Sequence, residues 1–190
     1  IHYYTQGRIG SQEVRFPFTL GHEGAGMVVD TGTEVTRVKP GDKIAIEPSL
    51  PCGKCDQCLG GRSHTCRKIR FLGCPEQAEG ALSEYIVMPE TSCFPLKPGM
   101  TYDDGAISEP LAIGVYTVRL AQMDMADKKT GILGFGPIGM SVLLSAKTKG
   151  ATRIYVSDKL DYRCDIARKA GAVWAGNPDR LDLVEQVAKQ

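Results

Sequence analysis

The chain has 190 residues, of which 42% are hydrophobic, so it can bury a core and is not a disordered segment. Its 23 basic and 22 acidic residues give a net charge of +1 without a basic block, which argues against a nucleic-acid or membrane-surface partner. No apolar run approaches the roughly 20 residues that span a bilayer, and the start does not resemble a signal peptide. Because the chain opens without a methionine and in mid-element, we expect it to be part of a longer protein.

The first half of the chain is predicted to consist of short strands joined by turns. Strands are expected at residues 26–30, 43–47 and 80–88, the last of them ended by Pro89. Residues 39–42 read Lys-Pro-Gly-Asp and predict a turn, because proline presets one backbone dihedral and glycine supplies a positive one. Strands this short and this closely spaced are typical of a barrel or a sandwich rather than of a parallel sheet.

The second half alternates strands with helices. In chain order the expected elements are a helix at 113–123, a strand at 130–133, a helix at 137–149, a strand at 153–158 and a helix at 160–170. Gly150 and Gly171 follow the last two helices, as glycine commonly does. This βαβα order indicates a parallel sheet, so the fold class is α/β with a first domain rich in β-strands.

Four of the seven cysteines form the pattern Cys52-x2-Cys55-x2-Cys58-x7-Cys66. Four thiolates at this spacing can bind one tetrahedral zinc ion, with Zn–S bonds of about 2.3 Å. An iron–sulfur cluster is the chemical alternative, because Cys-x2-Cys-x2-Cys also opens ferredoxin motifs. Those motifs continue with Cys-x3-Cys-Pro, whereas here seven residues separate Cys58 from Cys66. Unpaired or disulfide-bonded cysteines are the other alternative. We expect a structural zinc site without an open position, and such cysteines favour a reducing, cytoplasmic setting.

A Gly-x-Gly-x-x-Gly motif follows a predicted strand and opens a predicted helix. Gly134 allows the tight turn, Gly136 lets a pyrophosphate approach, and Gly139 lets helix and strand pack closely. Pro137 and Ile138 lie in the first turn of the helix, whose free amide groups then face the phosphates. The motif predicts a dinucleotide-binding turn, against the alternative of a purely structural glycine turn.

Asp158 lies 19 residues beyond Gly139, at the end of the next predicted strand. A carboxylate at this point accepts hydrogen bonds from both ribose hydroxyls and repels a 2′-phosphate, so NAD is favoured over NADP. Lys159 and Arg163 are basic neighbours that weaken this preference without reversing it. We count Arg163 among the expected cofactor-binding residues.

Residues 21–26 read Gly-His-Glu-Gly-Ala-Gly and open a longer pattern, Gly-His-Glu-x2-Gly-x5-Gly-x2-Val, which ends at Val35. This pattern resembles the signature of the zinc-containing, medium-chain alcohol dehydrogenases, and the four-cysteine spacing equals that of their structural-zinc lobe. Glu-Pro-Leu at 109–111 and Gly-Pro-Ile-Gly-Met at 136–140 look most like the sorbitol (L-iditol) or polyol dehydrogenase branch. The resemblance covers nearly the whole chain.

The resemblance implies a catalytic zinc ion bound by His22 and by a glutamate. Glu109 stands at the position of the family's later ligand, and Glu23 is the other candidate oxygen. Which of the two binds zinc directly and which binds it through water stays open. The family's first ligand is a cysteine, which would lie a few residues before His2 and therefore outside this sequence.

Two residues near the start acquire roles from the same resemblance. His2 matches a histidine that ends a proton relay from the alcohol, through a hydroxyl side chain and the cofactor ribose, to solvent. A neutral imidazole with an ordinary pKa near 6.5 suits the end of such a relay, and a disordered surface histidine is the alternative. Tyr3 matches an aromatic residue that lines the substrate pocket in sorbitol dehydrogenases.

The implied architecture is a GroES-like barrel followed by a truncated, doubly wound Rossmann domain. Residues 1–112 would form the GroES-like catalytic domain, with the structural zinc lobe at about 50–68. Residues 113–190 would form the N-terminal part of the NAD-binding domain, because only two or three of the roughly six Rossmann strands fit there.

The implied reaction is zinc-dependent oxidation of a secondary alcohol of a polyol, such as sorbitol or xylitol, to a ketone, with hydride transfer to NAD. A threonine or butanediol dehydrogenase built with the same motifs is the alternative among enzymes. A non-catalytic, zinc-binding family member is the alternative from another class. The expected partner is a small-molecule polyol or alcohol, and the resemblance suggests a homo-oligomer, a tetramer.

Overall fold

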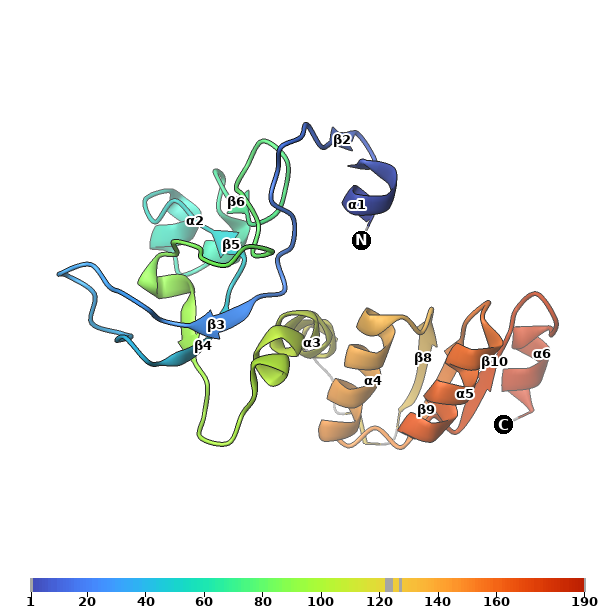
Figure 1. Ribbon diagram of the computed structural model, residues 1–190. Coiled ribbons are helices and arrows are strands. Elements are labelled where there is room, and N and C mark those ends of the chain that lie inside the picture. The colour runs from blue at the N-terminus through green and yellow to red at the C-terminus, as the bar shows by residue number, and fades with distance from the viewer. Residues whose placement is uncertain (1, 122–124, 127, 190) are drawn as a thin grey trace. The chain divides into compact units, whose positions relative to one another are not determined.

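The chain divides into two units, Ile1–Glu109 and Pro110–Gln190, in the computed structural model (Figure 1). The structure describes residues 2–121, 125–126 and 128–189. Among these residues, no helix has both the length and the apolar character that crossing a membrane requires.

The first unit is built from short strands, as predicted. Its elements in chain order are α1 (His2–Gln6), β1 (Arg8–Ile9), β2 (Gln12–Glu13), β3 (Ala25–Met27), β4 (Lys43–Ile46), β5 (Ser49–Leu50), α2 (Asp56–Leu59), η1 (Ser63–Thr65), β6 (Arg70–Phe71), η2 (Glu90–Ser92) and β7 (Cys93–Pro95). The helix α3 (Tyr102–Leu120) begins in this unit, which ends at Glu109, and continues into the second. Strands β3, β4 and β7 form an antiparallel sheet with β4 in the centre, while β1 pairs with β2 and β5 with β6.

A small apolar core holds this sheet together. Its buried members come from the central strand β4, from the start of β7 and from loops beside the sheet: Val38, Ile44, Ile46, Leu72 and Cys93. The predicted turn at 39–42 is confirmed, with Gly41 at a φ of +91° and Lys39 bonded to Asp42 at 2.7 Å. The turn therefore fixes how β3 and β4 meet, and with them the segment just before β3.

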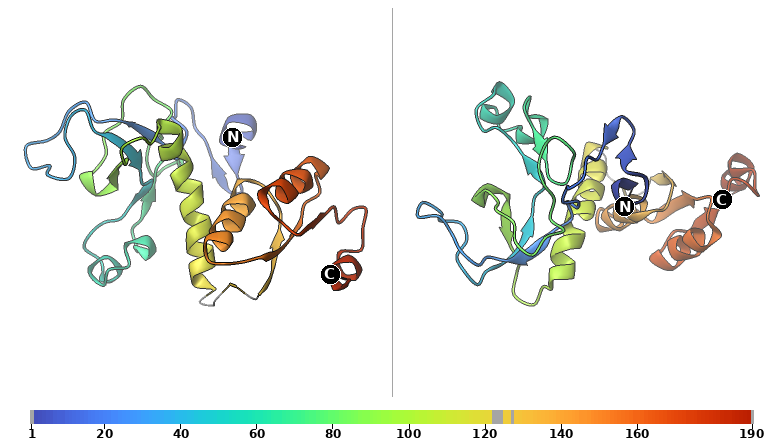
Figure 2. Two further views of the ribbon diagram at one scale, coloured as in Figure 1. Left: turned by 90° about the horizontal axis from the view of Figure 1, so that it is seen from below. Right: turned by 45° about the horizontal axis from the view of Figure 1, so that its top comes forward.

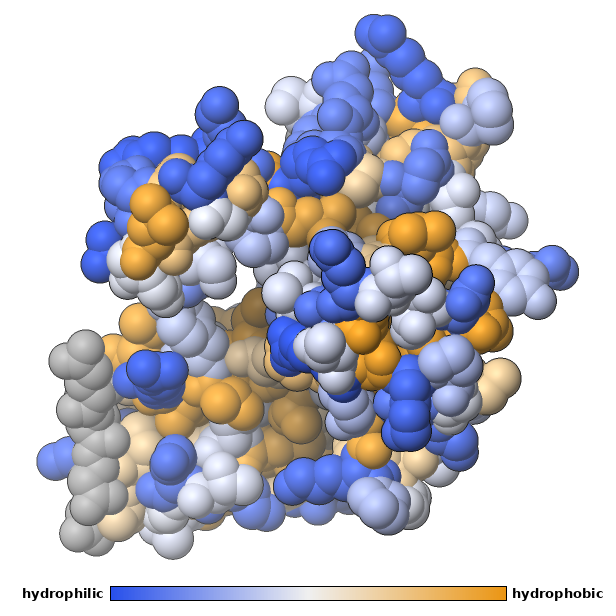
Figure 3. All heavy atoms as spheres, turned by 90° about the vertical axis from the view of Figure 1, so that its left-hand side faces the viewer, coloured by the Kyte–Doolittle hydropathy of each residue, from blue (hydrophilic) through white to orange (hydrophobic). Residues whose placement is uncertain are grey.

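The strand predicted at 80–88 is wrong. Residues 80–82 donate amide hydrogen bonds to the carbonyls of residues 19–21, and no strand ladder forms along the segment. Beyond them Tyr85 and Val87 are 73% and 98% exposed. Apolar alternation cannot distinguish a segment that pairs in a sheet from one that crosses another loop. The face shown in Figure 3 carries hydrophobic side chains among hydrophilic ones.

The helix predicted at 113–123 is part of the longer helix α3, which already begins at Tyr102; Met123 lies outside the described residues. Thr101 and Asp104 bond reciprocally at its start, since the Asp104 carboxylate accepts from the Thr101 amide at 2.7 Å and the Thr101 hydroxyl accepts from the Asp104 amide at 3.1 Å. Such a reciprocal cap satisfies amides that the first turn leaves free. Pro110 lies inside the helix, which is why the sequence suggested a later start.

The second unit has the predicted βαβα order and parallel sheet. Its further elements are β8 (Lys129–Leu133), α4 (Pro137–Thr148), β9 (Arg153–Ser157), α5 (Asp161–Ala170), β10 (Trp174–Gly176) and α6 (Leu183–Ala188). The three strands are parallel in the order β10-β9-β8, and α4 and α5 contact each other and the sheet (Figures 1 and 2).

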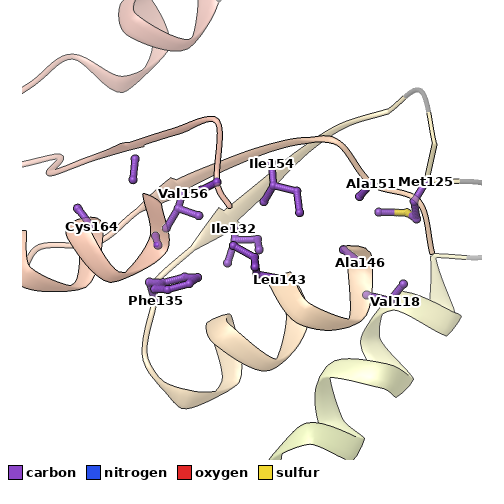
Figure 4. Close-up of a cluster of buried hydrophobic side chains, with 13 residues drawn as sticks. Val118, Met125, Ile132, Phe135, Leu143, Ala146, Ala151, Ile154, Val156 and Cys164 are labelled. Carbon is purple, nitrogen blue, oxygen red and sulfur yellow. The ribbon is translucent and has the colours of Figure 1, made fainter. Parts of the chain in front are cut away.

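The core of the second unit lies between the sheet and its helices. Leu143 and Ala146 of α4 and Ile154 of β9 are fully buried, and Cys164 of α5 is nearly so (Figure 4). Burying a leucine side chain stabilises a fold by about 1.5–3 kcal/mol. This core therefore holds the turn between β8 and α4 in place.

Substituting Leu143 with alanine should destabilise the second unit by about 2–5 kcal/mol, because it leaves a cavity in a closed core. Leu144 is the matched control: it follows in the same helix but is 44% exposed, so Leu144→Ala should cost less than about 1 kcal/mol. Urea denaturation followed by the fluorescence of the single tryptophan, Trp174, measures both. Equal costs at the two positions would contradict the assigned core.

Candidate metal centres and nucleotide-binding turn

The loop that carries His22 is fixed by a close crossing of backbones. Gly21 adopts a φ of +93°, a conformation that favours glycine. A Cβ atom added at Gly73 would overlap the Gly21 carbonyl, and one added at Gly80 would overlap the backbone of Leu20. Two segments distant in sequence can pass this closely only because the crossing points lack side chains. The crossing sets the direction in which His22 leaves the loop.

His22, Glu23 and Glu109 come together as a group of three potential metal ligands. One ligand atom from each lies within 4.8 Å of the others. His22 and Glu109 are half-buried, whereas Glu23 is exposed. Glu109 reaches the group from helix α3, which can approach β3 because a Cβ at Gly105 would lie only 2.8 Å from that of Ala25. The long helix therefore brings a distant carboxylate beside the histidine.

The charge around this group is negative. Burial raises the pKa of the Glu109 carboxyl above its ordinary value, and the charges of Glu23 and Glu47 raise it further, while His22 opposes the rise. Carboxylates that repel one another around an imidazole favour a bound cation, and one nitrogen with carboxylate oxygens suits zinc. The three side chains therefore fit a divalent metal. Glu47, which follows β4, carried no sequence signal for this role.

An aromatic ring supports the histidine. The ring of Phe71 contacts that of His22 edge-on, with 5.2 Å between centroids and 64° between planes. Edge-to-face pairs of this kind are favourable and orient both rings. No sequence pattern indicated this contact, because His22 and Phe71 lie far apart along the chain.

The four predicted thiols meet in one place. The Sγ atoms of Cys52, Cys55, Cys58 and Cys66 all lie within 4.8 Å of one another, and none is in a disulfide. Cys55 Sγ lies 3.6 Å from that of Cys58 and 3.9 Å from that of Cys66. Four thiols gathered without oxidation form a closed tetrahedral donor set, which suits zinc and leaves no position for a substrate.

Backbone amides prepare these sulfurs for metal. Cys66 Sγ accepts amide hydrogen bonds from Cys52 at 3.2 Å and Lys68 at 3.3 Å. The amides of Cys58 and Arg67 lower the pKa of Cys55 to about 6, so this thiol loses its proton readily. Desolvation and the neighbouring thiols raise the pKa of Cys58 to about 12. Four neighbouring thiols do not all lose their protons in the absence of a metal ion. A bound cation allows all four to ionise.

The glycine turn has the geometry that its motif predicts. Gly134 adopts a φ of +90°, and Gly136 caps helix α4, which opens with Pro137. A Cβ at Gly139 would overlap the Gly134 carbonyl, so only glycine allows this packing of helix against strand. Ile138 is exposed in the first turn. Free amides of a helix N-terminus at a turn without side chains can receive a phosphate.

Asp158 is tied to this turn. Its Oδ2 accepts from the Phe135 amide at 2.7 Å and its Oδ1 from the Leu160 amide at 2.9 Å, and Arg163 lies 3.5 Å away. Desolvation alone would raise the pKa of Asp158, but the amides of Phe135 and Leu160 and the charge of Arg163 outweigh it, so the pKa lies below its ordinary value. The carboxylate is therefore held ionised beside the glycine turn.

The two residues predicted near the start lie in α1. His2 is exposed and is not among the three grouped ligands of the first unit. The Tyr3 hydroxyl donates to Gln12 at 2.8 Å and lies 3.8 Å from Cys74 Sγ. Tyr3 therefore belongs to a polar network that reaches the loop after β6.

Comparison with known proteins bears on the family. The alcohol dehydrogenase GroES-like domain matches residues 1–98. The chain is 35% identical over 187 residues to a sorbitol dehydrogenase of Bacillus subtilis, covering 98% of this chain and 52% of that protein. It is 35% identical over 191 residues to an L-idonate 5-dehydrogenase of Vitis vinifera, covering 100% of this chain and 52% of that protein.

Solved structures give the same result. An L-idonate 5-dehydrogenase of Escherichia coli matches with a TM-score of 0.87 at 29% identity, over 97% of this chain and 53% of that one. A galactitol-1-phosphate dehydrogenase of Escherichia coli matches with a TM-score of 0.85 at 32% identity, over 92% of this chain and 50% of that one. The chain thus spans about half the length of the relatives that it matches. It belongs to the zinc-containing, medium-chain alcohol dehydrogenase family, whose GroES-like domain it carries.

Proposed function

We propose that the protein is a zinc-dependent, NAD-linked dehydrogenase that oxidises a secondary alcohol of a polyol to a ketone. The observation that carries this proposal is the meeting of His22, Glu23 and Glu109 within 4.8 Å, in a chain that also has a dinucleotide-type turn. A zinc ion supplies a charge that lowers the pKa of a hydroxyl, and NAD supplies an acceptor for hydride.

The residues of this chain would bind the metal ion and the nucleotide at two separate sites. His22, Glu109 and Glu23 would hold the metal, with either glutamate binding directly or through water. Glu47 adds a negative charge that the metal balances. In the nucleotide site the α4 amides would bind the pyrophosphate and Asp158 the ribose. Oδ1 of Asp158 accepts one amide and keeps a second lone pair for a ribose hydroxyl, whereas Oδ2 accepts the Phe135 amide and also lies 3.5 Å from Arg163.

Several further assignments are those that the family resemblance implies. His2 would pass the alcohol proton to solvent, and Tyr3 would line the substrate pocket. Residues 1–112 would be the catalytic domain and 113–190 the first part of the NAD-binding domain, with the four-cysteine lobe holding a structural zinc ion. A cytoplasmic, homotetrameric enzyme is the corresponding form of the whole protein.

The substrate class is inferred from relatives. Curated proteins at 34–35% identity include sorbitol dehydrogenase, D-xylulose reductase and L-idonate 5-dehydrogenase, whose names all refer to polyhydroxylated compounds. A secondary alcohol flanked by other hydroxyls is what these compounds share. We therefore place the substrate among polyols rather than among simple alcohols.

Zinc content tests the metal assignment. The complete gene product should hold about two zinc ions per chain, and His22→Ala should reduce this to about one, because only the four-thiol site keeps its ligands. His64→Ala is the matched control, since His64 belongs to neither group of ligands and should leave the content unchanged. Elemental analysis after dialysis gives the counts. One zinc ion per chain, unaffected by His22→Ala, would favour a non-catalytic, zinc-stabilised protein.

A substrate panel tests the reaction. With NAD as oxidant, sorbitol, xylitol and related polyols should be turned over with a kcat/KM at least about tenfold higher than L-threonine or butanediol, because a pocket built for several hydroxyls loses hydrogen bonds with other ligands. NADH formation followed by absorbance measures the rates. A preference for threonine or for the diol would move the protein to another branch of the family.

Coenzyme binding tests the role of Asp158. Asp158→Asn should weaken NAD binding roughly tenfold or more, because it removes the charge from a hydrogen bond to the ribose, and should narrow the preference for NAD over NADP. Asp161→Asn is the matched control, because Asp161 bonds to Asn177 and Arg180 instead of the turn. Fluorescence titration with NADH and NADPH measures both affinities. Unchanged selectivity in Asp158→Asn would contradict the assignment.

A further inference from the structure

The loop from Phe71 to Ala78 lies against the loop that carries His22. It touches that loop at two points: the ring of Phe71 meets the imidazole edge-on, and Gly73 meets the Gly21 carbonyl without room for a side chain. The position and the orientation of His22 therefore both depend on the shape of this second loop.

Gln77 closes that loop with its side chain. Its Oε1 accepts from the Phe71 amide at 2.8 Å, and its Nε2 donates to Cys74 Sγ at 3.3 Å. The preceding residue, Glu76, has a φ of +63°, which a residue with a side chain rarely adopts. One carboxamide thus spans a strained turn and fixes the backbone of the residue whose ring supports His22.

We propose that Gln77 is a positioning residue of the metal centre, acting through Phe71 to hold the imidazole of His22 in the direction of Glu23 and Glu109. This inference rests on the proposed function, since it assumes a metal at those three side chains. A ligand that is oriented before the metal arrives loses less conformational freedom on binding. Residues that support a ligand in this way typically contribute 10–100-fold to metal affinity.

A nearby glutamine provides a matched comparison. Gln12 also bonds to Cys74, since its Oε1 accepts from the thiol at 3.4 Å and from the Tyr3 hydroxyl. Among the described residues, the hydrogen bonds of the Gln12 side chain go to Tyr3 and Cys74 and not to Phe71. Gln12 and Gln77 therefore share the Cys74 thiol, while the bond to the Phe71 backbone belongs to Gln77.

Metal affinity measured site by site tests the proposal. In the complete gene product, titrated with a zinc chelator, the zinc-release step that is missing in His22→Ala belongs to the His22 site, and the remaining step belongs to the four-thiol site. Gln77→Leu should weaken zinc binding at the His22 site roughly tenfold and leave zinc release from the four-thiol site unchanged. Gln12→Leu should change neither. Gln77→Glu keeps an acceptor for the Phe71 amide and should restore most of the affinity.

A double-substitution cycle shows whether Gln77 acts through Phe71. Phe71→Leu should weaken the His22 site by itself, and adding Gln77→Leu should weaken it no further, because the ring that Gln77 positions is already absent. Additive losses would overturn the proposed route, and unchanged affinity in Gln77→Leu would overturn the role. If Gln77→Leu does not fold, Gln77→Asn, whose shorter side chain loses its reach to the Phe71 amide, gives the same comparison alone and combined with Phe71→Leu. A wild-type protein that releases a single zinc ion, unaffected by His22→Ala, would overturn the metal centre, and this inference with it.

Discussion

The close crossing of three glycines is the constraint on which the candidate metal centre depends. Gly21, Gly73 and Gly80 let the backbones of three loops pass within distances that any side chain would prevent. The amides of residues 80–82 then bond to the carbonyls of residues 19–21, so the loop before His22 is fixed on two sides. A histidine on such a loop has little freedom, and its direction is set by main-chain packing before any ligand is present.

The two groups of metal ligands are assembled in different ways. The four cysteines lie within a short stretch, and their sulfurs are drawn together by turns and by amides of the same stretch. The group of His22 needs Glu109 from a helix that starts far along the chain, and the negative charge of its carboxylates opposes its own assembly. The first arrangement suits a site that holds a lobe folded. The second suits a site whose geometry must be maintained by the whole unit.

Sequence reasoning succeeded where one local rule determined the outcome. The parallel βαβ unit, the glycine turn at Gly134 and the spacing of the four cysteines each follow from a short pattern. It failed for residues 80–88, where an alternating pattern serves a crossing instead of a strand. It also placed the start of α3 too late, although Thr101 and Asp104 form a capping pair that the sequence displays. Glu47 and Phe71 meet the His22 group only through contacts across the fold, and the bonds of Gln77 to Phe71 and Cys74, although local, follow no recognised motif.

The bond between Asp158 and the Phe135 amide has a consequence for redesign of coenzyme preference. The carboxylate that would recognise the ribose also accepts the amide of Phe135, the second residue of the glycine turn. The part of the site that would bind the ribose and the part that would bind the pyrophosphate are therefore coupled through one hydrogen bond. Replacing Asp158 to admit a 2′-phosphate would loosen the turn as well as change the charge. Exposed neighbours such as Lys159 have their charged groups elsewhere, since the Lys159 ammonium group lies 3.7 Å from Asp179. A redesign for NADP should therefore begin with these neighbours and leave the carboxylate in place.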